Sequence, residues 1–136
     1  MNHKVLKSKI INIFKKHKLS NEHALICANA LINAELVGAP THGLSRLKMY
    51  CDRIKKKLIN PRPKIKLKNI SQSVTHINAD DSIGFVAADT AIKKAIKNAK
   101  KTGIGLVAVK NSGHYGMSGY YAEQAVKKKH DSFCIY

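Results

Sequence analysis

The chain has 136 residues, a length that fits one domain or part of a larger one. It carries 25 Lys and Arg against 8 Asp and Glu, a formal net charge of +17, and its hydrophobic share of 44% argues against a wholly disordered chain. It has no run of about 20 apolar residues that could cross a membrane and no apolar N-terminal secretory signal, so we expect a cytoplasmic protein.

The first half of the chain predicts three helices. Apolar spacing favours a helix over residues 4–18 and a second one from a Ser20 or Asn21 cap to about Val37. The stretch 38–40, Gly-Ala-Pro, ends the second helix, and Thr41 is a plausible N-cap for a third helix that runs to about Leu58. A stiff proline-containing loop at 60–63 then divides a helical part, 1–60, from a second part, 61–136.

The second half predicts mixed strands and helices. We expect an edge strand at 64–68, a strand at 74–78, a turn at Asp80-Asp81, and a helix over 84–101 capped by Gly103. The apolar run 104–109 predicts a buried strand, followed by a glycine-rich loop at 111–116 and a helix from Ser118 to about Lys129. A further strand begins at 133–136, which leads us to expect the N-terminal piece of a longer protein.

Neither the cysteines nor the lysines indicate a dedicated site. The three cysteines share no metal-binding spacing, and no histidine cluster predicts a metal ion. Three basic residues are arginines, and the lysines that make up the rest are spread along the chain, as on solvated faces. A small basic module that binds nucleic acid or another polyanion stays as the rival class, although the chain has no Trp for base stacking.

The first candidate constellation follows the break at Pro40. On a continuous helix, His42, Arg46 and Tyr50 stand at positions i, i+4 and i+8 and share one stripe. This stripe offers a proton donor near neutral pH, a fork for a carboxylate and a phenol, a set that suits a small 2-oxo or 2-hydroxy acid. The competing interpretation is a surface helix with a capping Thr41 and an incidental histidine.

The second candidate constellation is the segment 111–121, between the predicted buried strand and the last helix. Its glycines allow backbone amides to approach a ligand, and a helix N-terminus favours an anion such as a cofactor phosphate. The spacing G-x-x-G-x-x-G matches neither the dinucleotide fingerprint nor the P-loop, so an ordinary strand-to-helix turn around His114 remains the alternative.

Taken in order, these segments resemble the type-2 malate/L-lactate dehydrogenase family of nicotinamide-dependent oxidoreductases. The matching stretches are 34–36 (AEL), 41–47 (THGLSRL), Tyr50, 58–61 (LINP), 81–84 (DSIG), 103–109 (GIGLVAV) and 111–121 (NSGHYGMSGYY). The family commonly has Ser, Pro and Phe where this chain has Thr41, Lys48 and Tyr115. The resemblance implies an α/β (α+β) chain in which a helical part precedes a cofactor-binding domain that is not a Rossmann fold.

The resemblance also implies roles for individual residues. His42 and His114 correspond to catalytic candidates, and Thr41, Arg46 and Tyr50 to the substrate-binding pocket. The loop that would contact the cofactor, NAD or NADP, comprises His114, Tyr115, Gly116, Met117 and Ser118. The implied reaction is hydride transfer between the nicotinamide and a small 2-hydroxy, 2-oxo or imino acid, in a homodimer of full-length chains.

Length is the main departure from the family, whose members are more than twice as long. We therefore expect the remaining cofactor contacts beyond Tyr136 and expect the chain alone to be catalytically silent. The resemblance implies no membrane and no specific nucleic acid as partner, and it leaves the particular acid and the choice of NAD or NADP open. A regulatory fragment that pairs with a full-length paralogue is a third possibility.

Overall fold

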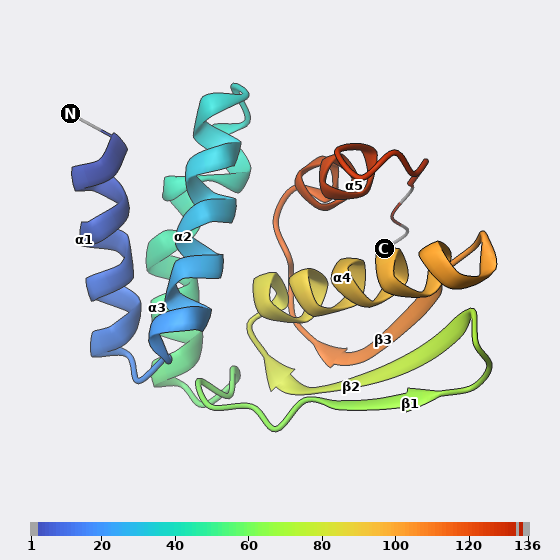
Figure 1. The fold of residues 1–136 in the computed structure, drawn as a ribbon. Coiled ribbons are helices and arrows are strands. Elements are labelled where there is room, and N and C mark those ends of the chain that lie inside the picture. Colours follow the sequence, from blue (N-terminus) through green and yellow to red (C-terminus); the bar gives the residue numbers. More distant parts are fainter. Residues whose placement is uncertain (1–2, 133, 135–136) are drawn as a thin grey trace.

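A computed structural model of the chain describes residues 3–132 and residue 134. Helices and strands are mixed, which confirms the predicted α/β (α+β) class, and a group of helices precedes a small sheet (Figure 1). In chain order the elements are α1 (His3–Lys16), α2 (Asn21–Leu36), the 3₁₀ turns η1 (Pro40–His42) and η2 (Leu44–Arg46), α3 (Leu47–Lys55), β1 (Lys66–Asn69), β2 (Val74–Ser82), α4 (Gly84–Thr102), β3 (Leu106–Ser112) and α5 (Ser118–Val126). The strand expected at 133–136 falls outside the described residues, apart from Cys134. No described helix is long and apolar enough to cross a membrane.

One buried cluster joins the helical part to the start of α4. Ser20 caps α2 as predicted, because its Oγ accepts the His23 backbone N–H at 3.1 Å. Ile10 and Phe14 of α1 are buried with the inner face of α2, and the same cluster reaches Phe85 in the first turn of α4. Residues before and after the loop at 60–63 therefore share one core.

The predicted third helix is wrong over its first residues. The chain makes the two short turns η1 and η2 before α3 begins at Leu47, because Gly43 between them has a ψ of −138° that no helix contains. The continuous stripe of His42, Arg46 and Tyr50 therefore does not exist as a helix face. Leu58, at which the third helix was expected to end, lies beyond the end of α3 and is 58% exposed.

The sheet has three strands in the order β1-β2-β3, with β1 antiparallel and β3 parallel to β2. Helix α4 connects β2 to β3 and covers one face, on which Thr75 and Ile77 of β2 are buried (Figure 1). Asn98 of α4 donates its Nδ2 to Thr75 Oγ1 at 3.1 Å, which joins helix and sheet in the interior. Tyr121 and Ala125 of α5 pack with Ile92 of α4 in a second, smaller cluster.

Two predictions about the strands need correction. Strand β3 is not buried: Leu106 is 56% and Val109 39% exposed, because β3 lies at one edge of the sheet and α4 covers a single face. Asp80 and Asp81 do not form a turn after the strand. Both have φ near +54° within β2, where they shift its register against β3 as a bulge.

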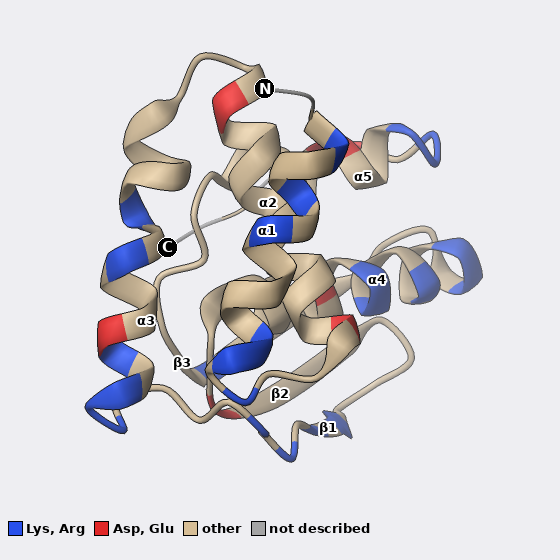
Figure 2. Cartoon of the chain, turned by 90° about the vertical axis from the view of Figure 1, so that its left-hand side faces the viewer, with Lys and Arg blue, Asp and Glu red and all other residues tan. Residues whose placement is uncertain are grey.

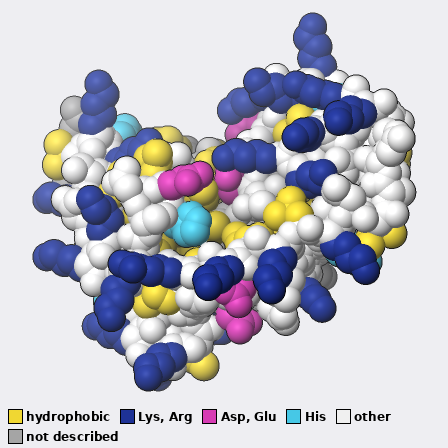
Figure 3. Space-filling model, turned by 60° about the horizontal axis from the view of Figure 1, so that its bottom comes forward, with side chains coloured by type: hydrophobic (Ala, Val, Ile, Leu, Met, Phe, Trp, Pro, Cys, Tyr) yellow, Lys and Arg dark blue, Asp and Glu magenta, His cyan; other side chains and the backbone are white. Residues whose placement is uncertain are grey.

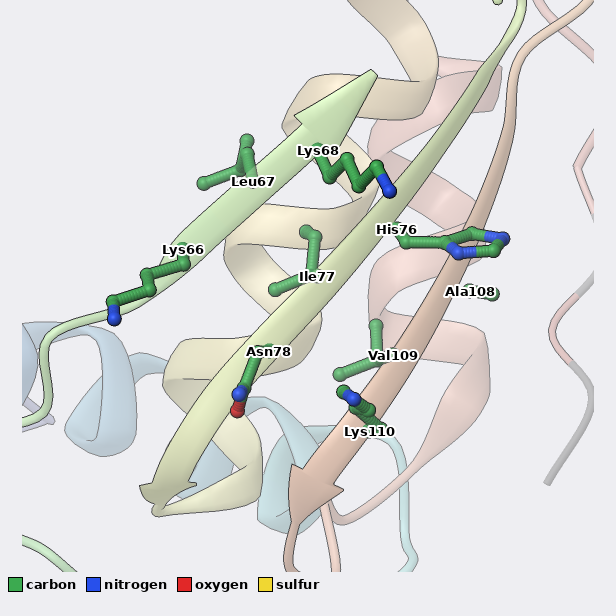
Figure 4. Close-up of a pocket in the computed structure, with 9 residues that line it drawn as sticks. All are labelled: Lys66, Leu67, Lys68, His76, Ile77, Asn78, Ala108, Val109 and Lys110. Carbon is green, nitrogen blue, oxygen red and sulfur yellow. The ribbon is translucent and has the colours of Figure 1, made fainter. Parts of the chain in front are cut away.

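The other face of the sheet carries a shallow hollow. Figure 4 shows that its lining side chains come from all three strands, with Lys66 and Lys68 from β1, His76 and Asn78 from β2, and Lys110 from β3. None of the described residues that line this hollow belongs to either predicted site.

Basic side chains are distributed over the whole chain. Lys and Arg occur on α1, α3, α4 and β1 (Figure 2), and they are scattered over the face shown in Figure 3, separated by uncharged and apolar side chains. Within residues 3–132, which contain every lysine, none is buried. This agrees with the interpretation of the lysines as solvated residues.

Candidate active site

The segment that carries His42 is fixed by a carboxylate from α2. The Leu44 backbone N–H donates to Glu35 Oε1 at 2.6 Å, and a Cβ at Gly43 would collide with the same carboxylate. The turns are tied further by the Ser45 hydroxyl, which donates to the Pro40 carbonyl at 2.7 Å. Glu35 therefore stabilises the turns where a continuous helix was expected.

Arg46 and His42 are both tied to Thr41. Arg46 donates its Nε to the Thr41 carbonyl at 2.8 Å, which leaves the outer end of the guanidinium directed away from this bond. Thr41 Oγ1 lies 3.1 Å from His42 Nδ1. The three predicted residues thus form one local group, assembled by turns.

The loop after β3 brings His114 against the start of α4. A Cβ at Gly84 would collide with the carbonyl oxygens of Gly113 and His114, so only glycine allows this approach. Gly116 has a φ of +81°, in the left-handed region, and faces the ring of Phe85. Glycine therefore has a structural reason at Gly116 within the loop and at Gly84 in the helix against which the loop packs.

The two constellations meet through Tyr50 and the histidines. Tyr50 Oη lies 2.8 Å from His114 Nδ1, although the two residues are 64 positions apart in the sequence. The rings of His42 and His114 are stacked, with centroids 5.8 Å apart and planes 24° from parallel. Tyr50 is 1% exposed and its ring lies 4.8 Å from that of Phe85, so the core cluster holds the phenol in place.

The environment of His114 favours its neutral form. Partial burial lowers the pKa of His114 below its ordinary value, and the nearby charges of His42, Arg46 and Arg53 lower it further. The result is a neutral imidazole beside the positive side chains of Arg46 and Arg53. Such a group of positive side chains attracts an anion to the site.

The remaining predicted cofactor residues lie on the path from His114 to α5. Tyr115 packs edge-to-face on Tyr121, whose hydroxyl donates to the Tyr115 carbonyl at 2.9 Å. Met117 and Ser118 lead into the N-terminus of α5, where no side chain of the described residues caps the helix and its first turn holds no acidic residue. Backbone N–H groups at the N-terminus of a helix can bind an anion such as a phosphate.

Sequence reasoning assigned no role to Glu35, Gly84 or Arg53. Glu35 had one available signal, since it is an acid just before the Gly-Ala-Pro break in a chain of net charge +17. Gly84 stood in the matching stretch 81–84 without an assigned role, and Arg53 had no signal, because the importance of both depends on which segments meet in space. Among the described residues no group of three or more His, Cys, Asp and Glu could hold a metal ion.

Comparison with known proteins finds a matching family model and similar dehydrogenases. Residues 1–135 match the model of the malate/L-lactate dehydrogenase family. The chain is 42% identical to a malate dehydrogenase of Pyrococcus abyssi over 88% of its own length and 33% of the relative's. It is 38% identical to an L-sulfolactate dehydrogenase of Methanocaldococcus jannaschii, over 90% of the chain and 36% of the relative.

Solved structures give the same result for the fold. The malate dehydrogenase of Pyrococcus horikoshii superposes with a TM-score of 0.91 at 39% identity, over 94% of this chain and 37% of that one. The chain thus spans about a third of the length of these relatives. The family match and the identities, together with the arrangement of helices and sheet, show that this chain belongs to the malate/L-lactate dehydrogenase family.

Proposed function

We propose that this chain supplies the substrate-binding arginine and the acid/base histidines of an NAD(P)-dependent oxidoreductase that acts on small 2-hydroxy and 2-oxo acids. The observation that carries the proposal is the stacked pair of His42 and His114, with Arg46 close enough for its charge to lower the pKa of His114. The relatives are named for malate and L-sulfolactate, which are both 2-hydroxy acids. The same substrate class follows for this chain.

In this proposal Arg46 binds the substrate carboxylate. Its Nε is tied to the Thr41 carbonyl, so the guanidinium enters the site preoriented and its outer nitrogens form two parallel bonds to a carboxylate. Thr41 and Tyr50 complete this side of the pocket. The carbon that bears the hydroxyl or oxo group is then held near the two imidazoles.

The histidines act on the substrate oxygen, where a proton is gained or lost together with hydride transfer. A neutral imidazole next to the substrate oxygen stabilises the charge that develops there, and an imidazole that changes its protonation state supplies or removes the proton. His42 and His114 come from separate segments and are stacked rather than bonded to each other, so each can act on the substrate independently.

The nicotinamide nucleotide, when bound, supplies or accepts the hydride. The chain's contribution to holding it is the segment from His114 through Tyr115, Gly116 and Met117 to Ser118. The N-terminal turn of α5 fits this group, because it presents backbone N–H groups to a phosphate, and the left-handed Gly116 shapes the loop that leads to this turn. NAD and NADP are equally compatible with these residues. Full-length chains would act as a homodimer, with neither membrane nor specific nucleic acid as partner.

Oxamate, an unreactive analogue of a 2-oxo acid, tests the proposal in the chain as it exists. We expect it to bind the purified chain and to shift the NMR signals of the His42, Arg46 and His114 side chains. Replacement of Arg46 by Gln removes a charge-assisted pair and weakens binding roughly 10-fold or more. The same chain with NADH or NADPH and a 2-oxo acid should show no turnover, because it spans a third of its relatives.

Arg62 provides a matched control. Like Arg46 it is an exposed arginine whose Nε donates to a backbone carbonyl, here that of Lys18 at 3.4 Å. Arg62→Gln should therefore leave oxamate binding unchanged. Equal loss in both variants would mean that net charge alone attracts the ligand, and shifts confined to other segments would place the acid elsewhere; either result contradicts the proposed site.

A further inference from the structure

His114 Nδ1 has two neighbours that determine where its proton lies. Tyr50 Oη is 2.8 Å away, and the Gly116 backbone N–H donates to the same nitrogen at 3.3 Å. A backbone N–H can only donate, so Nδ1 must be the acceptor and carries no hydrogen. The proton of the neutral ring is then on Nε2, and the Tyr50 hydroxyl also donates to Nδ1.

We propose that Tyr50 is a positioning residue that, with the Gly116 N–H, holds His114 as the Nε2–H tautomer. This extends the proposed function, on which its catalytic meaning rests, and gives Tyr50 a role toward the histidine in addition to lining the pocket. A residue that acts through His114 is expected to alter the protonation and hydrogen bonding of that ring, beyond any contact that it makes with the substrate.

The surroundings of Tyr50 keep its hydroxyl in this place. Its side chain is 1% exposed and packs on Phe85, which in turn faces Gly116. Gly84, which has no Cβ, lets the carbonyls of Gly113 and His114 approach the first turn of α4. The phenol and the loop are thus both built on the first turn of α4, so the distance between Tyr50 and His114 is set by the core.

The Nε2–H tautomer of His114 gives the two histidines different chemical roles. A neutral ring with its proton on Nε2 and its lone pair on Nδ1 already bonded has no free basic nitrogen. His114 then donates a hydrogen bond to the substrate oxygen and polarises it, as a preorganised donor does. Net transfer of the proton is left to His42, whose Nδ1 lies beside the Thr41 hydroxyl.

Nitrogen NMR of the ¹⁵N-labelled chain measures the tautomer without any enzyme assay. The His114 signals are assigned as those lost in His114→Asn. We expect the unprotonated, downfield type of resonance for Nδ1 and the protonated type for Nε2. Tyr50→Phe removes one hydrogen bond that favours the Nε2–H tautomer, which shifts the ratio of the two tautomers roughly 2- to 10-fold toward Nδ1–H and moves the averaged Nδ1 and Nε2 resonances toward each other.

Tyr121→Phe is the matched control. Tyr121 is also a buried tyrosine whose hydroxyl donates into the same loop, but to the Tyr115 carbonyl. This variant should leave the His114 nitrogens unchanged. If Tyr50→Phe does not fold, 3-fluorotyrosine in the native chain makes the phenol a stronger donor and displaces the Nδ1 resonance without removing the hydroxyl.

Two results would overturn the inference. One is a proton on Nδ1 in the native chain, which would make the Tyr50 oxygen an acceptor. The other is an Nδ1 resonance that neither Tyr50→Phe nor fluorination displaces. Both are independent of oxamate binding, so a correct tautomer without oxamate binding would reject the proposed function and leave the positioning role intact.

Discussion

Gly84→Ala is a small substitution in α4 that should displace the loop carrying His114. The added Cβ would collide with the carbonyl oxygens of Gly113 and His114, and would lie 2.5 Å from the His114 carbonyl carbon. Overpacking by a methyl group costs about 1–3 kcal/mol, and the upper half applies because backbone rather than a side chain must move. Alanine regains up to about 1 kcal/mol as a helix residue, so we expect a net loss of about 1–2 kcal/mol.

Urea unfolding of the two chains measures this free energy difference, and the NMR signals of His114 report the movement of the loop. Gly119→Ala is the control: Gly119 is also in the first turn of a helix, but a Cβ there meets no described atom within 4 Å. That variant should be neutral or slightly stabilising. If Gly84→Ala were as stable as Gly119→Ala, with His114 unmoved, the close approach that we infer between α4 and the loop would be wrong.

Two further predictions concern charge at the same site. Because the pKa of His114 is lowered in the folded chain, the unfolded chain binds more protons, so stability is complete above the ordinary value of 6.5 and falls as the pH drops below it. Urea midpoints between about pH 5 and 7 should show this slope, and His114→Asn should reduce it; an equal slope in both chains would assign the effect elsewhere. Glu35→Ala removes the acceptor of the Leu44 N–H and should cost about 1–3 kcal/mol in urea unfolding and weaken the His42 ring contact. Glu123→Ala, which removes an exposed ion pair, should cost less than about 0.5 kcal/mol, and similar losses in the two variants would refute the role of Glu35.

The sequence predicted the elements of the fold where local signals decide them. Ser20 caps α2, Gly103 ends α4 with a φ of +80°, and β1 is an exposed edge strand, all as expected from residue type and spacing. The burial of β3 could not be predicted in this way. An apolar run of that length is typical of a covered strand, and its neighbours in space decide whether it is covered.

The sequence predicted which residues belong to the candidate site but not which contacts bring them together. His42, Arg46 and Tyr50 were chosen for their helical spacing, yet Gly43 interrupts the helix and Glu35 stabilises the turns instead. The periodicity of a segment contains no information about a carboxylate that another helix supplies. The contact between Tyr50 and His114 likewise depends on the packing of α3 against α4, which no local pattern contains.

This construction explains why the site can be tested in the chain as it stands. Tyr50, Phe85 and the inner face of α2 belong to one buried cluster, and the hydrogen bonds to His114 Nδ1 come from Tyr50 of α3 and from Gly116 of the loop itself. The stacking of His42 depends on turns that Glu35 of α2 holds. The geometry of the two imidazoles is therefore determined by packing within this chain, which spans about a third of the length of its relatives. Substitutions at Tyr50, Gly84 and Glu35 therefore test what holds His42 and His114 in place. Their effects on stability and NMR signals can be measured without any assay of substrate turnover.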